Sequence, residues 1–206
     1  MAVILLTIGF LLFFVCVDTI TKKYRLDKEL SRKLVHIASG SLVAFLPFFI
    51  SFKQIALLSL IFIPVMFVSK KRKIFSSIHD VKRNTHGEVY FPLSILITAL
   101  LFPEIKIFMY ALLVMSFSDG LASIVGTRFG RKKFKIISGT KSYIGSMTFF
   151  ICTTIIGTLV LSLPLTSVLL AAVLLTLVEA MLSGGLDNLF LPPTAALLID
   201  HLQKFY

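Results

Sequence analysis

The sequence predicts an all-α protein, a bundle of membrane-spanning helices built by one domain over residues 1–206. Its composition is the first reason, because 57% of the 206 residues are hydrophobic and only 15% are charged. The second is that long apolar runs recur along the whole chain, more than the core of one soluble domain needs. The third is that Lys and Arg gather in a few loops between these runs, as in multi-pass membrane proteins.

The apolar runs predict about seven spans and a shorter final helix. Met1–Val17 lacks the basic start and the small-residue cleavage site of a signal peptide, so we interpret it as a retained first span. The later spans are expected over Leu34–Phe52, Gln54–Val68, Val89–Phe102, Ile105–Val125, Tyr143–Leu163 and Leu165–Leu182. The last run, Leu189–Ile199, carries Pro192 and Pro193 and is short for a crossing. We expect it to form a half-span or a short eighth helix.

The distribution of positive charge predicts the orientation of these spans. The loops after the first, third and fifth spans hold 18 of the 21 Lys and Arg residues, whereas the intervening turns hold only Lys53 and Lys106. The positive-inside rule therefore places the three basic loops in the cytoplasm and the N-terminus outside. The net charge of +11 then reflects contacts with anionic lipid heads or phosphates, and we expect no nucleic-acid partner. Cys16 and Cys152 lie far apart in apolar runs and predict neither a disulfide framework nor a zinc site.

Asp119 points most strongly to a functional site. It lies within the fifth predicted span, where a carboxylate is costly unless it pairs, coordinates a cation or faces water. Small and polar residues recur around it at a spacing of three and four and form one helix face: Ser116, Asp119, Gly120, Ser123, Gly126 and Thr127. Ser118 precedes Asp119 directly, and basic residues starting with Arg128 follow. A carboxylate that faces cations predicts a metal and phosphate site near the cytoplasmic side.

Further acidic residues lie in or beside apolar spans on the same side, and we expect them to join Asp119 in one site: Glu29, Glu88, Glu179 and Asp187. Glu88 opens the fourth span, where an acid is also favoured as a simple helix-start residue. Glu179 lies deep near the end of the seventh span. The following break presents Asp187 and Asn188 just before the short final helix, and broken helices with acids at membrane depth usually line cavities.

Two basic segments complete the candidate site. Glu29, Arg32, Lys33 and His36 share one helix face. They form either a solvated ion pair at the membrane edge or a phosphate clamp, in which His36 binds phosphate or moves a proton.

The second basic segment is small, flexible and cationic, and it comprises Gly139, Thr140, Lys141 and Ser142. Backbone amides at a helix start suit phosphate oxygens. The segment lacks the spacing of a Walker A loop. A plain tight turn is the alternative interpretation.

Five blocks resemble the CTP-dependent polyprenol kinases, namely dolichol kinase, phytol kinase and yeast-type diacylglycerol kinase. They are Glu29–His36 (E-L-S-R-K-L-V-H), Gly87–Leu93 (G-E-V-Y-F-P-L), Ser118–Gly130 (S-D-G-L-A-S-I-V-G-T-R-F-G), Gly139–Ser146 (G-T-K-S-Y-I-G-S) and Val178–Pro192 (V-E-A-M-L-S-G-G-L-D-N-L-F-L-P). The blocks occur in order over nearly the whole chain. Within the last block, Ser183–Leu186 (S-G-G-L) departs from the Pro-containing version of the family.

The resemblance implies a multi-pass enzyme that transfers the γ-phosphate of CTP to a lipid alcohol or diacylglycerol. It implies that the D-G-L-A-S-I-V-G and G-T-K-S blocks bind the nucleotide, and with them Ser118, Gly120, Ser123, Gly126, Gly139, Thr140 and Ser142. On this basis we expect Asp119 to hold Mg²⁺, with Asp187 as a second ligand or as the base that orients the lipid hydroxyl. The cations expected on the triphosphate are Lys141, Arg32, Lys33 and Arg128, while Glu88, Glu179, Asn188 and His36 are further candidates for metal binding, base catalysis or orientation.

Two other functions fit parts of this pattern. A membrane cytidylyltransferase, in which a lipid phosphate attacks the α-phosphate of CTP and releases pyrophosphate, shares the acid-rich metal site. A proton- or cation-coupled transporter fits Asp119 and Glu179 but not the basic loops or the glycine turns. The expected partners are CTP, a lipid alcohol and membrane lipids, and the sequence predicts no oligomeric state.

Overall fold

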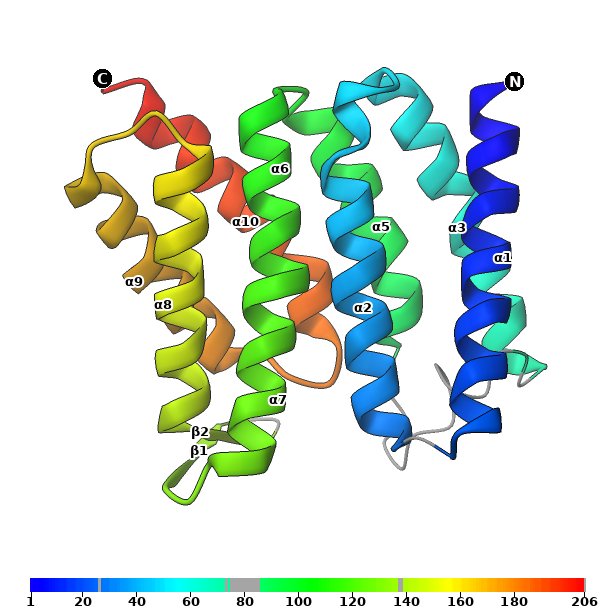
Figure 1. Ribbon diagram of the computed structural model, residues 1–206. Coiled ribbons are helices and arrows are strands. Elements are labelled where there is room, and N and C mark those ends of the chain that lie inside the picture. The colour runs from blue at the N-terminus through cyan, green and yellow to red at the C-terminus, as the bar shows by residue number, and fades with distance from the viewer. Residues whose placement is uncertain (26, 73, 75–85, 137–138, 206) are drawn as a thin grey trace.

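The computed structural model describes residues 1–25, 27–72, 74, 86–136 and 139–205, and it is a bundle of helices with a short hairpin at one end (Figure 1). The helices are α1 (Ala2–Lys23), α2 (Lys28–Ala44), the 3₁₀ turn η1 (Leu46–Phe48), α3 (Phe52–Lys71), α5 (Gly87–Leu101), α6 (Ile105–Leu113), the π-helical η2 (Val114–Ser118), α7 (Asp119–Phe129), α8 (Tyr143–Val160), α9 (Leu165–Met181) and α10 (Leu186–Gln203). The strands β1 (Lys133–Ile136) and β2 (Gly139–Ser142) pair antiparallel. The predicted all-α class is confirmed, and the hairpin is the addition that the sequence did not predict.

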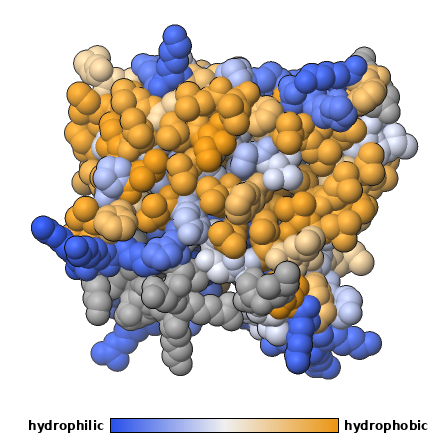
Figure 2. All heavy atoms as spheres, turned by 180° about the vertical axis from the view of Figure 1, so that it is seen from behind, coloured by the Kyte–Doolittle hydropathy of each residue, from blue (hydrophilic) through white to orange (hydrophobic). Residues whose placement is uncertain are grey.

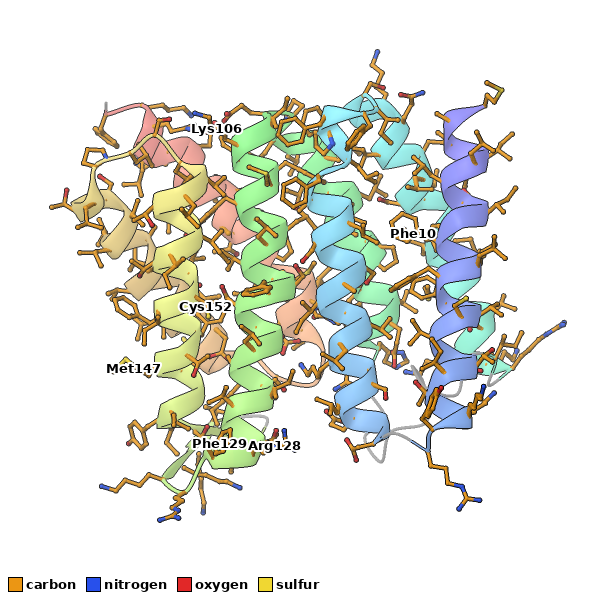
Figure 3. All side chains as sticks on the ribbon, viewed as in Figure 1. Phe10, Lys106, Arg128, Phe129, Met147 and Cys152 are labelled. Atoms are coloured by element: carbon orange, nitrogen blue, oxygen red, sulfur yellow. The ribbon has the colours of Figure 1, made fainter. Side chains whose placement is uncertain are left out.

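The three basic loops meet at one end of the bundle. The α1–α2 connection, the end of α3 and the β1–β2 hairpin all lie at the lower end in Figure 1, whereas the α2–α3, α5–α6 and α8–α9 turns lie at the upper end. Lys106 and Arg128 mark the two ends of the continuous helix formed by α6, η2 and α7 (Figure 3). The shared end of the basic loops agrees with the predicted arrangement, and its cytoplasmic orientation stays a prediction.

The outer surface has the character of a membrane protein. Figure 2 shows a broad hydrophobic band between two hydrophilic ends. Within the part of the chain that the structure describes, four helical stretches are long and apolar enough to cross a membrane: Ala2–Lys23, Phe52–Lys71, Ile105–Phe129 and Tyr143–Val160. The helices Gly87–Leu101 and Leu165–Met181 are apolar but shorter. Large apolar side chains point outward along the band, among them Leu159, which is 80% exposed, and such a surface is stable only when lipid covers it.

The continuous helix from Ile105 to Phe129 is the centre of the bundle. In its most apolar stretch of 18 residues, 67% of the residues are buried, whereas only 6% are buried in the corresponding stretch of α1. Phe108, Tyr110 and Leu112 of α6 are fully buried, and Phe149 of α8 and Leu191 of α10 belong to the same core. The helix α10 packs on α5, α6 and α9. The residues of the predicted site around Asp119 therefore lie in the best-packed helix.

Several helices are longer than the apolar runs that predicted them, among them α1, α3 and α10. The prediction of a short final helix over Leu189–Ile199 is wrong in length, because α10 has 18 residues and includes Asp187 and Asn188 in its first turn. An acid in a first turn is favoured by the helix dipole, so polar residues start this helix rather than precede it. The first helix continues beyond Val17, where Asp18 and Lys22 form an ion pair of 2.6 Å across one turn.

The orientation is testable with single cysteines. In a background in which Cys16 and Cys152 are replaced by serine, Lys106→Cys should react with a membrane-impermeant maleimide in intact cells, while Lys133→Cys should react only after lysis. These positions lie at opposite ends of the bundle. Labelling of Lys133→Cys but not Lys106→Cys in intact cells would reverse the topology. Ser77, in a second basic loop, lies outside the described residues.

Candidate active site

A π-helical turn places Asp119 within the central helix. The Asp119 N–H donates to the carbonyls of Ser116 and Val114, three and five residues earlier, rather than to that of Met115 four residues earlier. The Met115 carbonyl is then free to accept from elsewhere, and the Nε2 of His36 on α2 lies 3.2 Å from it. Since a carbonyl only accepts, Nε2 carries the proton of this bond, and Nδ1 of a neutral ring remains an acceptor. Such π turns are frequent at functional sites.

The Asp119 carboxylate is buried beside a lysine of the neighbouring helix. Its side chain is 3% exposed, and the Oδ2 atom lies 3.6 Å from the Nζ atom of Lys33, whose side chain is 13% exposed. The separation is that of an ion pair rather than of a hydrogen bond, and Oδ2 has no hydrogen-bond partner. Asp119 therefore has a compensating charge and one buried oxygen that is free to accept.

The hairpin brings a second lysine to this group of charges. Lys141 on β2 pairs with Glu179 of α9, and their side chains are 18% and 4% exposed. Burial alone would lower the pKa of the Lys141 ammonium, but the carboxylates of Glu179, Asp119 and Asp187 outweigh burial and raise its pKa above the ordinary value. Lys141 thus stays protonated at physiological pH and lies within the electrostatic reach of three acids.

The turn between α9 and α10 brings Asp187 to the same region. Gly184 and Gly185 have φ angles of +70° and +93°, which residues other than glycine rarely adopt. A Cβ at Gly185 would also lie 2.7 Å from the backbone of Gly87, where α5 begins. Asn188 fixes this junction, because its Nδ2 donates to the carbonyl of Gly87 over 3.1 Å. Asp187, in the same first turn, lies close enough to Asp119, Lys33 and Lys141 for their charges to act on its carboxylate.

A cleft opens beside Asp119 between α2 and α7. Its volume is about 250 Å³, and its lining residues are Asp27, Glu29, Leu30, Lys33, Ser123, Ile124, Thr127 and Arg128. Three of the residues predicted to bind nucleotide therefore share one cavity, namely Lys33, Ser123 and Arg128. Arg128 lies at the basic end of α7 (Figure 3). Lys33 belongs to both features, since it lines the cleft and pairs with Asp119.

Several predicted site residues make structural contacts instead of facing this cleft. Glu88 lies 3.5 Å from the Nζ atom of Lys70, and Arg32 forms a 2.7 Å pair with Glu29. The Arg32–Glu29 pair agrees with the ion-pair alternative for its segment, and Glu88 lies in the first turn of α5, as its helix-start alternative requires. Ser142 accepts from the Gly145 N–H and caps the start of α8. Gly139 and Thr140 are exposed on the hairpin.

The glycines of the central helix serve close packing. A Cβ at Gly120 would collide with Ile37 of α2. A Cβ at Gly126 would lie 2.7 Å from the Oγ of Ser142 and 3.3 Å from the Cα of Gly145. The small residues that predicted a nucleotide site therefore allow α2, β2 and α8 to pack close to α7. The neighbouring Ser118 is fully buried, and its Oγ has no hydrogen-bond partner.

Sequence reasoning missed two features of the site. The Met115 carbonyl carried no signal, because its exposure to His36 depends on the π turn. The pairing of Lys141 with Glu179 joins residues 38 positions apart, and only the positions of β2 and α9 bring them together. Acids at membrane depth and nearby lysines were visible in the sequence, but their partners were not.

The acids fit a magnesium site only in combination with a ligand. Among the described residues, no group of three or more His, Cys, Asp or Glu side chains lies close enough to hold a metal ion by itself. Mg²⁺ is commonly bound by one or two carboxylates, with substrate phosphates and water completing its shell. The free buried Oδ2 of Asp119, with Asp187 nearby, fits that smaller set of donors.

Comparisons with known proteins agree on one relationship. The chain is 26% identical over 185 residues to the phytol kinase of Synechocystis sp., covering 82% of this chain and 78% of the relative. It is 31% identical over 140 residues to a probable chloroplastic phytol kinase 2 of Glycine max, covering 65% and 47%. An uncharacterized protein of Methanocaldococcus jannaschii is 28% identical over 189 residues, covering 84% and 94%. The chain thus spans about half the length of the soybean relative but nearly the whole archaeal one.

The relationship to phytol kinases recurs in other organisms. Chloroplastic relatives of that name from Triticum aestivum and Arabidopsis thaliana are each 30% identical, over 176 and 148 residues. No family model matches the chain, and no solved structure is similar to it. The predicted resemblance to the group that includes the phytol kinases is nevertheless confirmed by these relatives.

Proposed function

We propose that this chain is a lipid-alcohol kinase that transfers the γ-phosphate of CTP, with Mg²⁺, to a membrane-embedded isoprenoid alcohol. The names of the relatives support the coarser part of this proposal, a kinase that takes a nucleotide donor and a lipid alcohol. The choice of CTP and Mg²⁺ rests on the sequence motifs and on the chemistry of the site.

One observation carries the proposal most directly. Lys33 lines the cleft between α2 and α7 and pairs with the buried Asp119 at the same time. A cleft with Lys33 and Arg128 in its wall suits a polyphosphate, because cations form strong charge-assisted hydrogen bonds with phosphate oxygens. The terminal phosphate of a nucleotide in the cleft would then lie toward Asp119. Phosphoryl transfer needs this kind of positioning and charge neutralisation more than covalent chemistry.

The reaction follows from these groups. The oxygen of the lipid hydroxyl attacks the γ-phosphorus and forms a new O–P bond. The bond from γ-phosphorus to the bridging oxygen breaks, and CDP leaves with that electron pair. The hydroxyl proton passes to a nearby base, for which Asp187 is our candidate. Lys33, Lys141 and Arg128 neutralise the charge on the phosphates, and Asp119 would hold Mg²⁺, which would supply further neutralisation when bound.

The pair of Lys141 and Glu179 suggests how the site is kept ready. A buried lysine without a counter-charge is costly, so Glu179 holds Lys141 in place until a phosphate arrives. The phosphate then competes with Glu179 for the ammonium group. The same logic applies to Lys33 and Asp119. The acids thus organise the cations in the absence of nucleotide, and the basic loops around them attract the anionic donor.

Labelled nucleotides test the reaction class. With purified protein, Mg²⁺ and an isoprenoid alcohol, ³²P from the γ-position of CTP should appear in the lipid, and label from the α-position should remain in CDP. A membrane cytidylyltransferase would do the reverse with a lipid phosphate as acceptor and would release the γ-label as pyrophosphate. Thin-layer chromatography separates these products. Entry of α-label alone into the lipid would refute the kinase proposal.

Asp119→Asn should lower kcat by two or more orders of magnitude while the protein stays folded, on the order of the loss when a transition-state charge partner is removed. Asp200→Asn is the matched control, because Asp200 is another helical acid but pairs only across one turn with Lys204, over 2.7 Å. Size-exclusion profiles in detergent should be the same for both variants. Turnover of Asp119→Asn within a factor of about three of the parent protein would exclude an essential role.

Lys141→Ala should raise the KM for nucleotide more than the KM for lipid, because it removes a cation from the phosphate site. The variant also leaves Glu179 buried without its partner, which costs about 3–5 kcal/mol of stability. The double variant Lys141→Ala/Glu179→Gln should recover stability but not nucleotide affinity. Lys135→Ala, on the paired strand and exposed, is the control. Recovery of nucleotide affinity in the double variant would assign Lys141 a purely structural role.

A further inference from the structure

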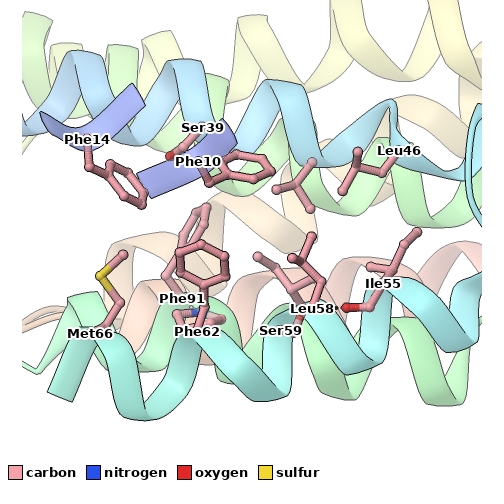
Figure 4. A pocket seen from close by; sticks show the side chains of 13 residues that line it. Phe10, Phe14, Ser39, Leu46, Ile55, Leu58, Ser59, Phe62, Met66 and Phe91 are labelled. Atoms are coloured by element: carbon pink, nitrogen blue, oxygen red, sulfur yellow. Dashed lines mark hydrogen bonds between the residues drawn. The ribbon is translucent and has the colours of Figure 1, made fainter. Parts of the chain in front are cut away.

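A narrow apolar hollow lies between α1, α2, α3 and α5, apart from the charged cleft (Figure 4). Phe10 and Phe14 of α1, Phe62 of α3 and Phe91 of α5 contribute aromatic rings to its wall. The rings of Phe10 and Phe62 meet edge to face at a centroid distance of 5.9 Å. No charged side chain lines the hollow, so its occupant must be apolar where it contacts these walls.

The polar groups in the wall leave no partner for a polar ligand. The hydroxyl of Ser59 donates to the carbonyl of Ile55 over 2.9 Å, and that of Ser39 donates to the carbonyl of His36 over 3.4 Å. Both bonds are made within the residue's own helix, so neither hydroxyl needs a ligand. A head group placed here would lose its hydrogen bonds to water and gain none. A hydrocarbon chain has no such cost.

One end of the hollow leads to the candidate active site. Phe91 lines the hollow and also stacks edge to face on His36, with ring centroids 5.0 Å apart. His36 in turn contacts the π turn that precedes Asp119 through the Met115 carbonyl. A single pair of rings therefore separates the apolar wall from the buried carboxylate. A chain lying in the hollow would have its polar end at His36, within reach of the phosphate site.

The hollow has the length of an extended chain, but it must widen to admit one. Wall residues on α3 run from Ile55 to Met66, a distance of about 16 Å at the rise of an α-helix. The cavity itself has a volume of only about 40 Å³, so α1 must move outward to admit a chain. Only 6% of the residues in the apolar stretch of α1 are fully buried, and the contacts that this movement breaks include those of Phe10 and Phe14 with Phe62 of α3.

We propose that this hollow holds the hydrocarbon tail of the acceptor alcohol and that α1 is its lateral gate to the lipid phase. The inference rests on the proposed kinase function and deepens it, since it assigns the tail to a defined surface and the hydroxyl to the His36 end. The acceptor is then a lipid with a single long hydrocarbon chain and one polar end, such as an isoprenoid alcohol.

A chain-length series tests the assignment. Alcohols of two to four isoprene units should differ in kcat/KM by about threefold to tenfold per unit, because lipid tails already lie in apolar surroundings and only packing separates them. Ser59→Phe fills the hollow and should abolish this dependence while a two-unit alcohol is still phosphorylated. Thr158→Phe adds the same side chain on the exposed face of α8 and should leave the dependence intact. An unchanged dependence in Ser59→Phe would overturn the proposal.

Ser59→Phe adds volume to a buried position, so a second variant protects the test against misfolding. Phe10→Ala enlarges the hollow from the peripheral helix α1 and should raise the relative rate for the longest alcohol. Loss of all rates in Ser59→Phe, together with an unchanged length profile in Phe10→Ala, would also reject the assignment.

Photo-crosslinking separates this inference from the kinase proposal. An isoprenoid alcohol with a terminal diazirine should label peptides of α1 and α3 without any nucleotide, and excess isoprenoid alcohol should compete more strongly than phospholipid. If labelling occurs but no phosphate is transferred, the hollow is a tail site and the kinase function is wrong. If phosphate is transferred but labelling is absent, or phospholipid competes equally well, the tail assignment is wrong.

Discussion

The burial of one carboxylate in the central helix constrains the rest of this structure. Asp119 lies in the most deeply packed helix, with its side chain only 3% exposed. A charge at that depth is stable only with a fixed partner, and Lys33 of α2 supplies it. The α2 helix must therefore lie close to α7, and Gly120 makes this approach possible because any Cβ there would collide with Ile37. Charge pairing and close helix packing depend on each other at this point.

The π turn connects this charge to the lipid side of the bundle. It shifts the hydrogen bond of Asp119 by one residue and exposes the Met115 carbonyl, which orients His36. His36 then presents its ring to Phe91 and so joins the polar site to the apolar wall between α2, α3 and α5. A local change in helix winding thus places the candidate polar site next to an apolar wall.

Segments far apart in the chain supply the other charges. The hairpin after α7 delivers Lys141, the end of α9 delivers Glu179, and the glycine turn before α10 delivers Asp187. Each connection lies at the basic end of the bundle, so the site combines the deepest acid with residues that reach the aqueous phase. The archaeal relative has nearly the length of this chain, with 94% of it covered.

The sequence by itself determined the class of the protein and most of its parts. Apolar runs of span length, basic loops at alternate ends and an acid at membrane depth follow from composition and spacing, because the cost of charge in lipid is independent of the details of packing. The resemblance to phytol kinases was also visible in five ordered blocks. The extents of α1 and α10 were underestimated, since hydropathy does not register an ion pair within a turn or an acid that stabilises a helix start.

Only the tertiary structure decided which charges are partners and which glycines are packing contacts. The sequence predicted the same role for Lys33 and Lys141 as phosphate-binding cations. In the structure, Lys33 pairs with Asp119 and Lys141 pairs with Glu179. Glu88 and Arg32 were also candidate site residues in the sequence, but they pair with Lys70 and Glu29. The physical reason is that helix rotation and the path of a two-stranded hairpin set side-chain distances to within an ångström. The spacing of residues along the chain determines which of them share a helix face, but not which residues of a neighbouring element pack against that face.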